Sequence, residues 1–293
     1  MTRAQSTKKS ASDLMVRIVA AAVLVPVALF GAWVGGALFG IFIAGLGVLM
    51  ALEWTAMICK DQKKQQVVYI LSAIAAGLAM FSPSIAVVVA IIAVMWGASI
   101  VMALSDGLTK WHVLGVPYIA LPLLALVVLR ADGTGTGTGT GASASYGLTA
   151  VIIIFACVWT ADTLAYFAGR GFGGPKLWPA VSPNKTWSGF FGAVAGGLLA
   201  AVLVFYFSGL NNLIAAALLG AAIGGLEQGG DLFESAAKRK FGIKDSGSII
   251  PGHGGVLDRV DGLMAAAIAA WAFGAIRSGS WENAASGLLN WPL

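Results

Sequence analysis

The sequence predicts an all-α, polytopic integral membrane protein, and three observations support this class. Hydrophobic residues make up 58% of the chain and charged residues only 11%, whereas soluble domains average about 45–50% apolar and roughly 25% charged residues. Apolar runs long enough to cross a bilayer, about 20 residues, recur along the chain. These runs are apolar on every side, which excludes the alternating pattern of an outer-membrane barrel and favours helical spans.

The apolar runs predict nine candidate spans, or eight if two of them form a single unit. They lie at residues 15–34, 36–54, 67–82, 84–104, 112–130, 147–169, 189–208, 211–229 and 261–277. The third span is short and meets the fourth at Ser82–Ser84, so this pair could instead be a hairpin or a re-entrant element. The run 15–34 is too long for a cleaved signal peptide and is interpreted as a retained first span.

Basic residues predict the orientation, because cytoplasmic loops carry the excess of Lys and Arg. With the N-terminus inside, all of the 18 basic residues except Arg130 and Arg277 fall on the cytoplasmic side. The pattern predicts a cytoplasmic tail at 1–14, N-terminal helices over 15–130, an outer loop at 131–146, a catalytic region over 147–277 and a C-terminal tail at 278–293.

Several patterns receive a structural interpretation rather than a functional one. The run "GTGTGTGTG" at 133–141 lacks the Lys-Ser/Thr of a P-loop and is interpreted as a linker, and "GRGFGG" at 169–174 follows an apolar span rather than a strand. Small residues at 192–197 and 218–225 are typical of close helix packing in membranes. The two cysteines, Cys59 and Cys157, are expected to be free thiols.

Charge is concentrated in "KRKFGIKDSGSIIPGHGGVLDRVD" at 238–261, between two segments that carry almost none. Asp231 precedes this stretch, and Asp258 and Asp261 end it three residues apart, on one face if the chain is helical. Carboxylates that converge at a membrane surface suit a hard divalent cation such as Mg²⁺, which is usually held together with substrate phosphates. Asp258 could alternatively only pair with Arg259 or another loop base.

Other polar residues complete a candidate phosphate site. If the helix continues past Asp231, Ser235, Lys238 and Arg239 follow on the same side, and "SPNKTW" at 182–187 offers Lys185 and two hydroxyls. Basic clusters can also be simple positive-inside signals. The glycines of "PGHGG" permit close backbone approach to a ligand. Asp162 lies within an apolar span, where an ionisable residue is a functional candidate, although it could merely pair with a lysine.

At these residues the sequence resembles the phosphatidate cytidylyltransferases, also called CDP-diacylglycerol synthases. Residues 235–261 are similar to the family pattern S-x-hydrophobic-K-R-x₄-K-D followed by H-G-G-hydrophobic-x-D-R-hydrophobic-D, with Ala237 smaller than expected. The segment "SPNKTWSG" at 182–189 is similar to S-P-x-K-T-x-E-G, with Ser188 where the family usually has Glu. "ADTLAYFAGRGFG" at 161–173 resembles D-T-x-A-Y-x-x-G. The resemblance is specific over about residues 160–262.

The resemblance implies transfer of CMP from CTP to phosphatidic acid, which yields CDP-diacylglycerol and pyrophosphate, with Mg²⁺ alone or with a second cation as cofactor. The metal ligands would be Asp231, Asp258 and Asp261, which form the catalytic set together with Lys238 and Arg239. The expected substrate-binding residues are Ser182, Lys185, Thr186, Ser235, Lys244, Asp245, His253, Gly254, Gly255, Arg259 and Asp162.

The expected partners are CTP, phosphatidic acid and membrane lipids, with no nucleic acid, and close helix packing would permit a homodimer. The location implied is a bacterial inner membrane, with the active site facing the cytoplasm. Two alternatives stay open: a CTP-dependent lipid-alcohol kinase, which transfers the γ-phosphoryl group, and a transporter of phosphorylated solutes. Midplane helix breaks and internal repeats would favour a transporter, but the charges cluster at one surface instead.

Overall fold

The computed structural model describes residues 22–58, 63–82, 84–132, 146–250 and 254–291. Within these ranges, eight helices are long and apolar enough to cross a membrane, and a shorter apolar helix, Ala22–Val34, precedes them. The eight are α2 Gly36–Ile58, α3 Lys63–Leu78 with the short helix η1 Ala79–Phe81, α4 Ile85–Ser105, α5 Lys110–Ala131, α6 Tyr146–Phe172, α7 Trp187–Phe207, α8 Leu213–Lys240 and α9 Leu257–Ser278. The predicted class, an all-α polytopic membrane protein, is confirmed.

The third and fourth predicted spans form two separate helices. Helices α3 and α4 pack against each other, and each is long enough to cross a membrane once η1 is included. The first predicted span, 15–34, lies partly outside the described residues, as do residues 1–14, Cys59 and the Gly-Thr run. Cys157 is a free, buried thiol, as expected.

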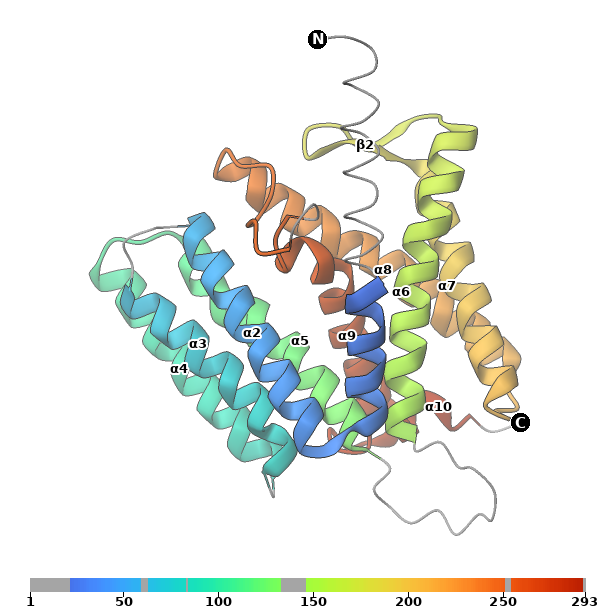
Figure 1. Ribbon diagram of the computed structural model, residues 1–293, viewed down its shortest axis with the longest axis horizontal. Coiled ribbons are helices and arrows are strands. Elements are labelled where there is room, and N and C mark those ends of the chain that lie inside the picture. Colours follow the sequence, from blue (N-terminus) through green and yellow to red (C-terminus); the bar gives the residue numbers. More distant parts are fainter. Residues whose placement is uncertain (1–21, 59–62, 83, 133–145, 251–253, 292–293) are drawn as a thin grey trace.

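Helix α5 lies between the two groups of helices that Figure 1 shows, α2, α3 and α4 on one side and α6 and α7 on the other. It packs against α2, α3, α4, α6 and α9. Within an apolar 18-residue stretch of α5, 72% is buried inside the protein, compared with 17% for the corresponding stretch of α4. Helices α7 and α8 approach closely at Gly197, Gly220 and Gly224, where an added Cβ would strike the facing helix. The predicted close packing through small residues is confirmed there.

A two-stranded hairpin stands where the sequence predicted only a loop. Strand β1, Lys176–Trp178, pairs antiparallel with β2, Ser182–Thr186, so that Lys176 lies opposite Thr186 and Trp178 opposite Ser182. Figure 1 shows this hairpin beyond the end of α6. Because β2 runs directly into α7, the hairpin fixes the position of Lys185.

Helices α8 and α9 carry the charged sequence at their ends. Helix α8 continues to Lys240, beyond the predicted end at residue 229, and α9 begins at Leu257, before the predicted start at residue 261. Both helices therefore extend into the charged stretch, and Asp258 lies in the first turn of α9. The short helix α10, Ala284–Leu289, packs against α9 within the predicted C-terminal tail.

Candidate active site

The charged residues of β2, α8 and α9 meet at one junction, named here the charged junction and consisting of Lys185, Asp231, Ser235, Lys238 and Asp258. On α8, Asp231, Ser235 and Lys238 follow one another at helical steps of four and three residues, which places them on one face. The Ser235 hydroxyl donates to Asp231 Oδ1 at 3.2 Å. The predicted continuation of the helix past Asp231 thus produces the expected polar face.

Lys185 joins the hairpin to α8. Its Nζ lies 2.7 Å from Asp231 Oδ2 and donates to Gln228 Oε1 at 2.8 Å. The Gln228 amide in turn donates to Glu227 Oε1 at 2.6 Å. The side chains of Lys185 and Asp231 are 16% and 33% exposed, so this pair can be reached from solvent while its lysine is held in one place.

Lys238 joins α8 to α9. Its Nζ lies 2.6 Å from Asp258 Oδ1, and the two side chains are only 12% and 6% exposed. The other oxygen, Asp258 Oδ2, accepts from the backbone N–H groups of Ser246 at 2.9 Å and Gly255 at 2.8 Å. Asp258 therefore has a cation on one oxygen and two backbone donors on the other, which fixes its orientation.

Glycines make the backbone approach to Asp258 possible. Gly254 has a φ of +80°, in the left-handed region that L side chains avoid, and an added Cβ would lie 2.7 Å from Asp258 Oδ2. At Gly255 an added Cβ would strike the Ser246 hydroxyl and lie 2.7 Å from Glu53 Oε2. The absence of a Cβ at these two glycines therefore leaves space for the carboxylates of Asp258 and Glu53.

Glu53 of α2 binds the same segment from the other side. Its Oε1 accepts from Val256 N–H and its Oε2 from Leu257 N–H, both at 2.9 Å. The Ser246 hydroxyl lies 3.4 Å from Oε2, and Glu53 is only 3% exposed. A residue from the N-terminal helices thus contacts the start of the helix that carries Asp258 and Asp261.

The acids near the charged junction form a larger electrostatic group. Asp261 accepts from Gly262 N–H at 2.9 Å, and its carboxyl group also makes a side-chain hydrogen bond with Glu234. Glu234 is fully buried, and its Oε1 lies 3.4 Å from Lys238 Nζ. Mutual electrostatic interactions connect Asp162, Glu227, Asp231, Glu234, Asp258 and Asp261. Lys185, Lys238 and Arg259 are among the cations that interact with them.

These carboxylates are candidate ligands for a divalent cation. Among the described residues, no group of three or more His, Cys, Asp or Glu side chains is arranged to hold a metal ion. Mg²⁺ is usually held by one or two carboxylates plus substrate phosphates and water. One or two carboxylates of this group would be enough for that arrangement.

The remaining predicted site residues lie at the edges of the junction or outside it. Asp162 is exposed on α6 and interacts electrostatically with Asp231, Lys185 and Arg259. Arg239, Lys244, Asp245 and Arg259 are exposed, and Arg239 Nη1 lies 3.4 Å from the Ile243 carbonyl oxygen. His253 lies outside the described residues.

The hydroxyl of Thr186 already has a structural partner. Thr186 is the N-cap of α7, where its Oγ1 accepts from Gly189 N–H at 3.1 Å, and Ser188 Oγ lies 2.9 Å away. The Ser188 hydroxyl also donates to the Gly173 carbonyl oxygen at 2.5 Å. Ser188, which stands where the family usually has Glu, thus links the end of α6 to the start of α7. Ser182 is half-buried at the first position of β2.

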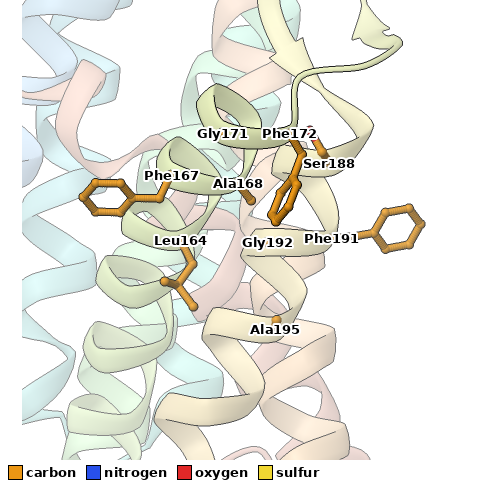
Figure 2. Close-up of a pocket in the computed structure, with 9 residues that line it drawn as sticks. All are labelled: Leu164, Phe167, Ala168, Gly171, Phe172, Ser188, Phe191, Gly192 and Ala195. Carbon is orange, nitrogen blue, oxygen red and sulfur yellow. The ribbon is translucent and has the colours of Figure 1, made fainter.

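An apolar cavity of about 610 Å³ lies between α6 and α7, close to this hairpin. Leu164, Phe167 and Phe172 line it from α6, and Ser188 and Phe191 from α7. Figure 2 shows the rings of Phe167 and Phe191 pointing away from each other at its two edges. Ser188, in the first turn of α7, is the lining residue that follows the hairpin most closely in sequence.

Sequence reasoning missed Glu53, Glu227, Gln228, Glu234 and Ser246. A signal existed for Glu53, because an ionisable residue inside an apolar span is a functional candidate, the same rule that selected Asp162. Glu227 and Glu234 lie in "GGLEQGGDLFES" beside Asp231, where only the aspartate was selected. The contact of Ser246 depends on how the loop folds, and local sequence does not reveal that.

Comparison with known proteins decides the family. A family model described as "Cytidylyltransferase family" matches residues 15–277. The chain belongs to the cytidylyltransferase family. Among curated relatives, a phosphatidate cytidylyltransferase of Brucella abortus (strain 9-941) is 40% identical over 270 residues, which cover 90% of this chain and 94% of that protein.

Other members of this family extend the similarity. A phosphatidate cytidylyltransferase of Pseudomonas aeruginosa is 36% identical over 261 residues, covering 85% of this chain and 93% of the relative. One from Haemophilus influenzae is 45% identical over 126 residues, which cover 41% of this chain and 44% of the relative. The resemblance inferred from the charged motifs is thus confirmed over most of the chain.

Proposed function

We propose that the chain is a phosphatidate cytidylyltransferase, which transfers CMP from CTP to phosphatidic acid and releases pyrophosphate. Relatives that bear this name match most of its length. The observation that carries the proposal for the site is the charged junction, where Lys185–Asp231 and Lys238–Asp258 bring β2, α8 and α9 together. Lysines and carboxylates are combined there.

The chemistry of the reaction fits such a site. A phosphate oxygen of phosphatidic acid attacks the α-phosphorus of CTP, and the bond from that phosphorus to the bridging oxygen breaks as pyrophosphate leaves. The nucleophile is a phosphomonoester with a second pKa of about 6, so it is already mostly dianionic at pH 7. No general base is needed. The obstacle is repulsion between two polyanions, and positioned positive charge reduces it.

The lysines are assigned to phosphate binding. In the structure Lys185 and Lys238 are each paired with a carboxylate, and substrate phosphates would compete for these two ammonium groups. Lys238 and Arg239 would contact the reacting phosphates, while Lys244, Arg259 and Lys185 would hold the rest of the triphosphate or the phosphatidate headgroup. Ser182, Thr186, Ser235, Asp245, His253, Gly254, Gly255 and Asp162 are assigned to the surrounding substrate site.

The carboxylates are assigned to a cation. Asp231, Asp258 and Asp261 would hold Mg²⁺, alone or with a second cation, as one or two ligands completed by substrate phosphates. When bound, the ion would neutralise charge on the phosphate oxygens. Lysines that move to substrate phosphates would leave Asp231 Oδ2 and Asp258 Oδ1 free to accept it.

The protein is an integral membrane protein, and we place the site on the cytoplasmic side of a bacterial inner membrane. The distribution of Lys and Arg supports this orientation, and so does the need for CTP, which is a cytosolic substrate. The apolar cavity between α6 and α7 offers a surface for membrane lipid. A homodimer stays a prediction.

Product identification tests the proposal. The purified chain would be supplied with CTP, Mg²⁺ and vesicles that contain phosphatidic acid, and the lipids would be analysed by mass spectrometry. We expect a lipid that has gained a cytidylyl group, with release of pyrophosphate. A lipid that has gained only a phosphoryl group would indicate a kinase, and uptake of a phosphorylated solute without turnover would indicate a transporter; either would refute the proposal.

A further inference from the structure

A carboxylate from the N-terminal half of the chain completes the start of α9. The N-cap residue of α9, Val256, makes no capping hydrogen bond with its side chain. Helix starts leave backbone N–H groups without partners inside the helix, and acceptor side chains usually satisfy them. Here Glu53 accepts from Val256 and Leu257, at separations of 203 and 204 residues along the chain.

The environment of Glu53 indicates a fixed, specific contact. A buried carboxylate is costly unless it is fully hydrogen-bonded, and Glu53 is only 3% exposed. Its two oxygens receive the two backbone donors, and the positive end of the helix dipole favours a negative charge at this position. An added Cβ at Gly247 would lie 2.6 Å from Glu53 Oε1, so the loop backbone passes directly beside this carboxylate.

Ser246 connects Glu53 to the charged junction. The Ser246 hydroxyl lies 3.4 Å from Glu53 Oε2, while its backbone N–H donates to Asp258 Oδ2 at 2.9 Å. Asp258 Oδ1 in turn lies 2.6 Å from Lys238 Nζ. Glu53 and Asp258 thus contact the same loop residue, Glu53 at its hydroxyl and Asp258 at its backbone N–H. The first turn of α9 is therefore attached to both α2 and α8.

We infer that Glu53 is a positioning residue, which sets the place of Asp258, and through it of Lys238, for binding of the substrate phosphates. The inference rests on the proposed function for its substrate, but the contact itself does not. Glu53 is not assigned a contact with substrate or metal. It fixes the backbone donors of the loop and the first turn of α9, on which the orientation of Asp258 depends.

The test compares Glu53→Ala and Glu53→Gln with the matched control Thr55→Ala. Thr55 is also a buried polar residue of α2, but its hydroxyl donates to the Ala51 carbonyl oxygen of the same helix. Gln keeps the shape of Glu and one acceptor oxygen, so it should serve only one of the two backbone donors well. The readouts are the KM for CTP, kcat, and hydrogen exchange at the amides of Val256 and Leu257.

For Glu53→Ala we expect at least about tenfold faster exchange at these two amides, a KM for CTP that is at least fivefold higher, and about ten- to hundredfold lower kcat/KM, since loss of a helix cap and buried hydrogen bonds typically has effects of this order. Glu53→Gln should fall between Ala and wild type, and Thr55→Ala should change each quantity less than twofold. If Glu53→Ala does not fold, the exchange rates and kinetic constants of Glu53→Gln test the inference alone.

Two results would overturn the inference. One is wild-type exchange at the two amides together with wild-type KM and kcat. The other is faster exchange throughout the protein with unchanged KM, because a purely structural role lowers the folded fraction without altering the site. Failure of the proposed function is distinguishable: wild-type protein would then make no CDP-diacylglycerol, while the exchange measurement would still decide whether Glu53 holds the loop.

Discussion

Replacing Asp258 by Asn tests the junction at its most constrained residue. The carboxylate serves Lys238 with Oδ1 and the Ser246 and Gly255 N–H groups with Oδ2. An Asn side chain has one acceptor oxygen and one NH₂ donor, so it can satisfy one side only and must present a donor to the other. The lysine also loses its closest counter-charge in a site where the two side chains are only 12% and 6% exposed.

The size of the effect follows from this geometry. Removing one partner of a buried charge pair costs about 3–5 kcal/mol. If a loss of this size falls on the bound transition state, where Asp258 would pair with the cation instead of Lys238, turnover decreases by about 10²- to 10⁴-fold, since each 1.36 kcal/mol is a factor of ten. The predicted result is a folded protein with almost no turnover.

The assay measures transfer of label from α-labelled CTP into lipid by purified Asp258→Asn, with thermal unfolding measured in parallel. The control is Asp106→Asn, because Asp106 is an exposed acid at the end of α4 and should retain wild-type turnover. A well-folded Asp258→Asn variant with normal turnover would remove Asp258 from the active site and refute the reasoning.

Three further predictions concern other parts of the site. Lys185→Met should raise the KM for CTP about tenfold, because hydrogen bonds to charged groups contribute about 1.5–3 kcal/mol; steady-state kinetics would check this, with Lys176→Met on the exposed strand β1 as an unaffected control. Gly255→Ala should destabilise the protein by about 1–3 kcal/mol and lower turnover, because its Cβ would lie 2.7 Å from Glu53 Oε2; thermal unfolding should show no such loss for Gly45→Ala, where an added Cβ meets nothing within 4 Å. Removal of divalent cations with EDTA should abolish turnover and added Mg²⁺ should restore it, whereas full turnover in EDTA would contradict the assigned role of the carboxylates.

The helical part of the site could be predicted from local sequence. Residues spaced at three and four positions must share a helix face once the helix continues, and α8 does continue through Asp231, Ser235 and Lys238. Likewise, Asp258 and Asp261 lie on one helix, α9, as their spacing predicted. Hydropathy predicted the spans for a similar reason, because the length of an apolar run is a local property.

The parts that sequence reasoning missed depend on contacts between distant segments. Glu53 and Val256 are 203 residues apart, and no local pattern pairs them. Thr186 belongs to a motif that indicated a phosphate site. That its hydroxyl also caps α7 could not be predicted, because the cap requires the turn from β2 into the helix. The hairpin itself was predicted as a loop. Its strands have only three and five residues, which is too short for an alternating strand pattern to be recognised between two long helices.

The most direct test of the central claim is to follow both ends of the CTP triphosphate in one reaction. The purified chain would receive phosphatidic acid, Mg²⁺ and CTP labelled separately at the α- and γ-phosphates. The account predicts that the α label enters the lipid while the γ label leaves in pyrophosphate, and that Asp258→Asn prevents both. Entry of the γ label into lipid would contradict cytidylyl transfer and identify the chain as a kinase instead.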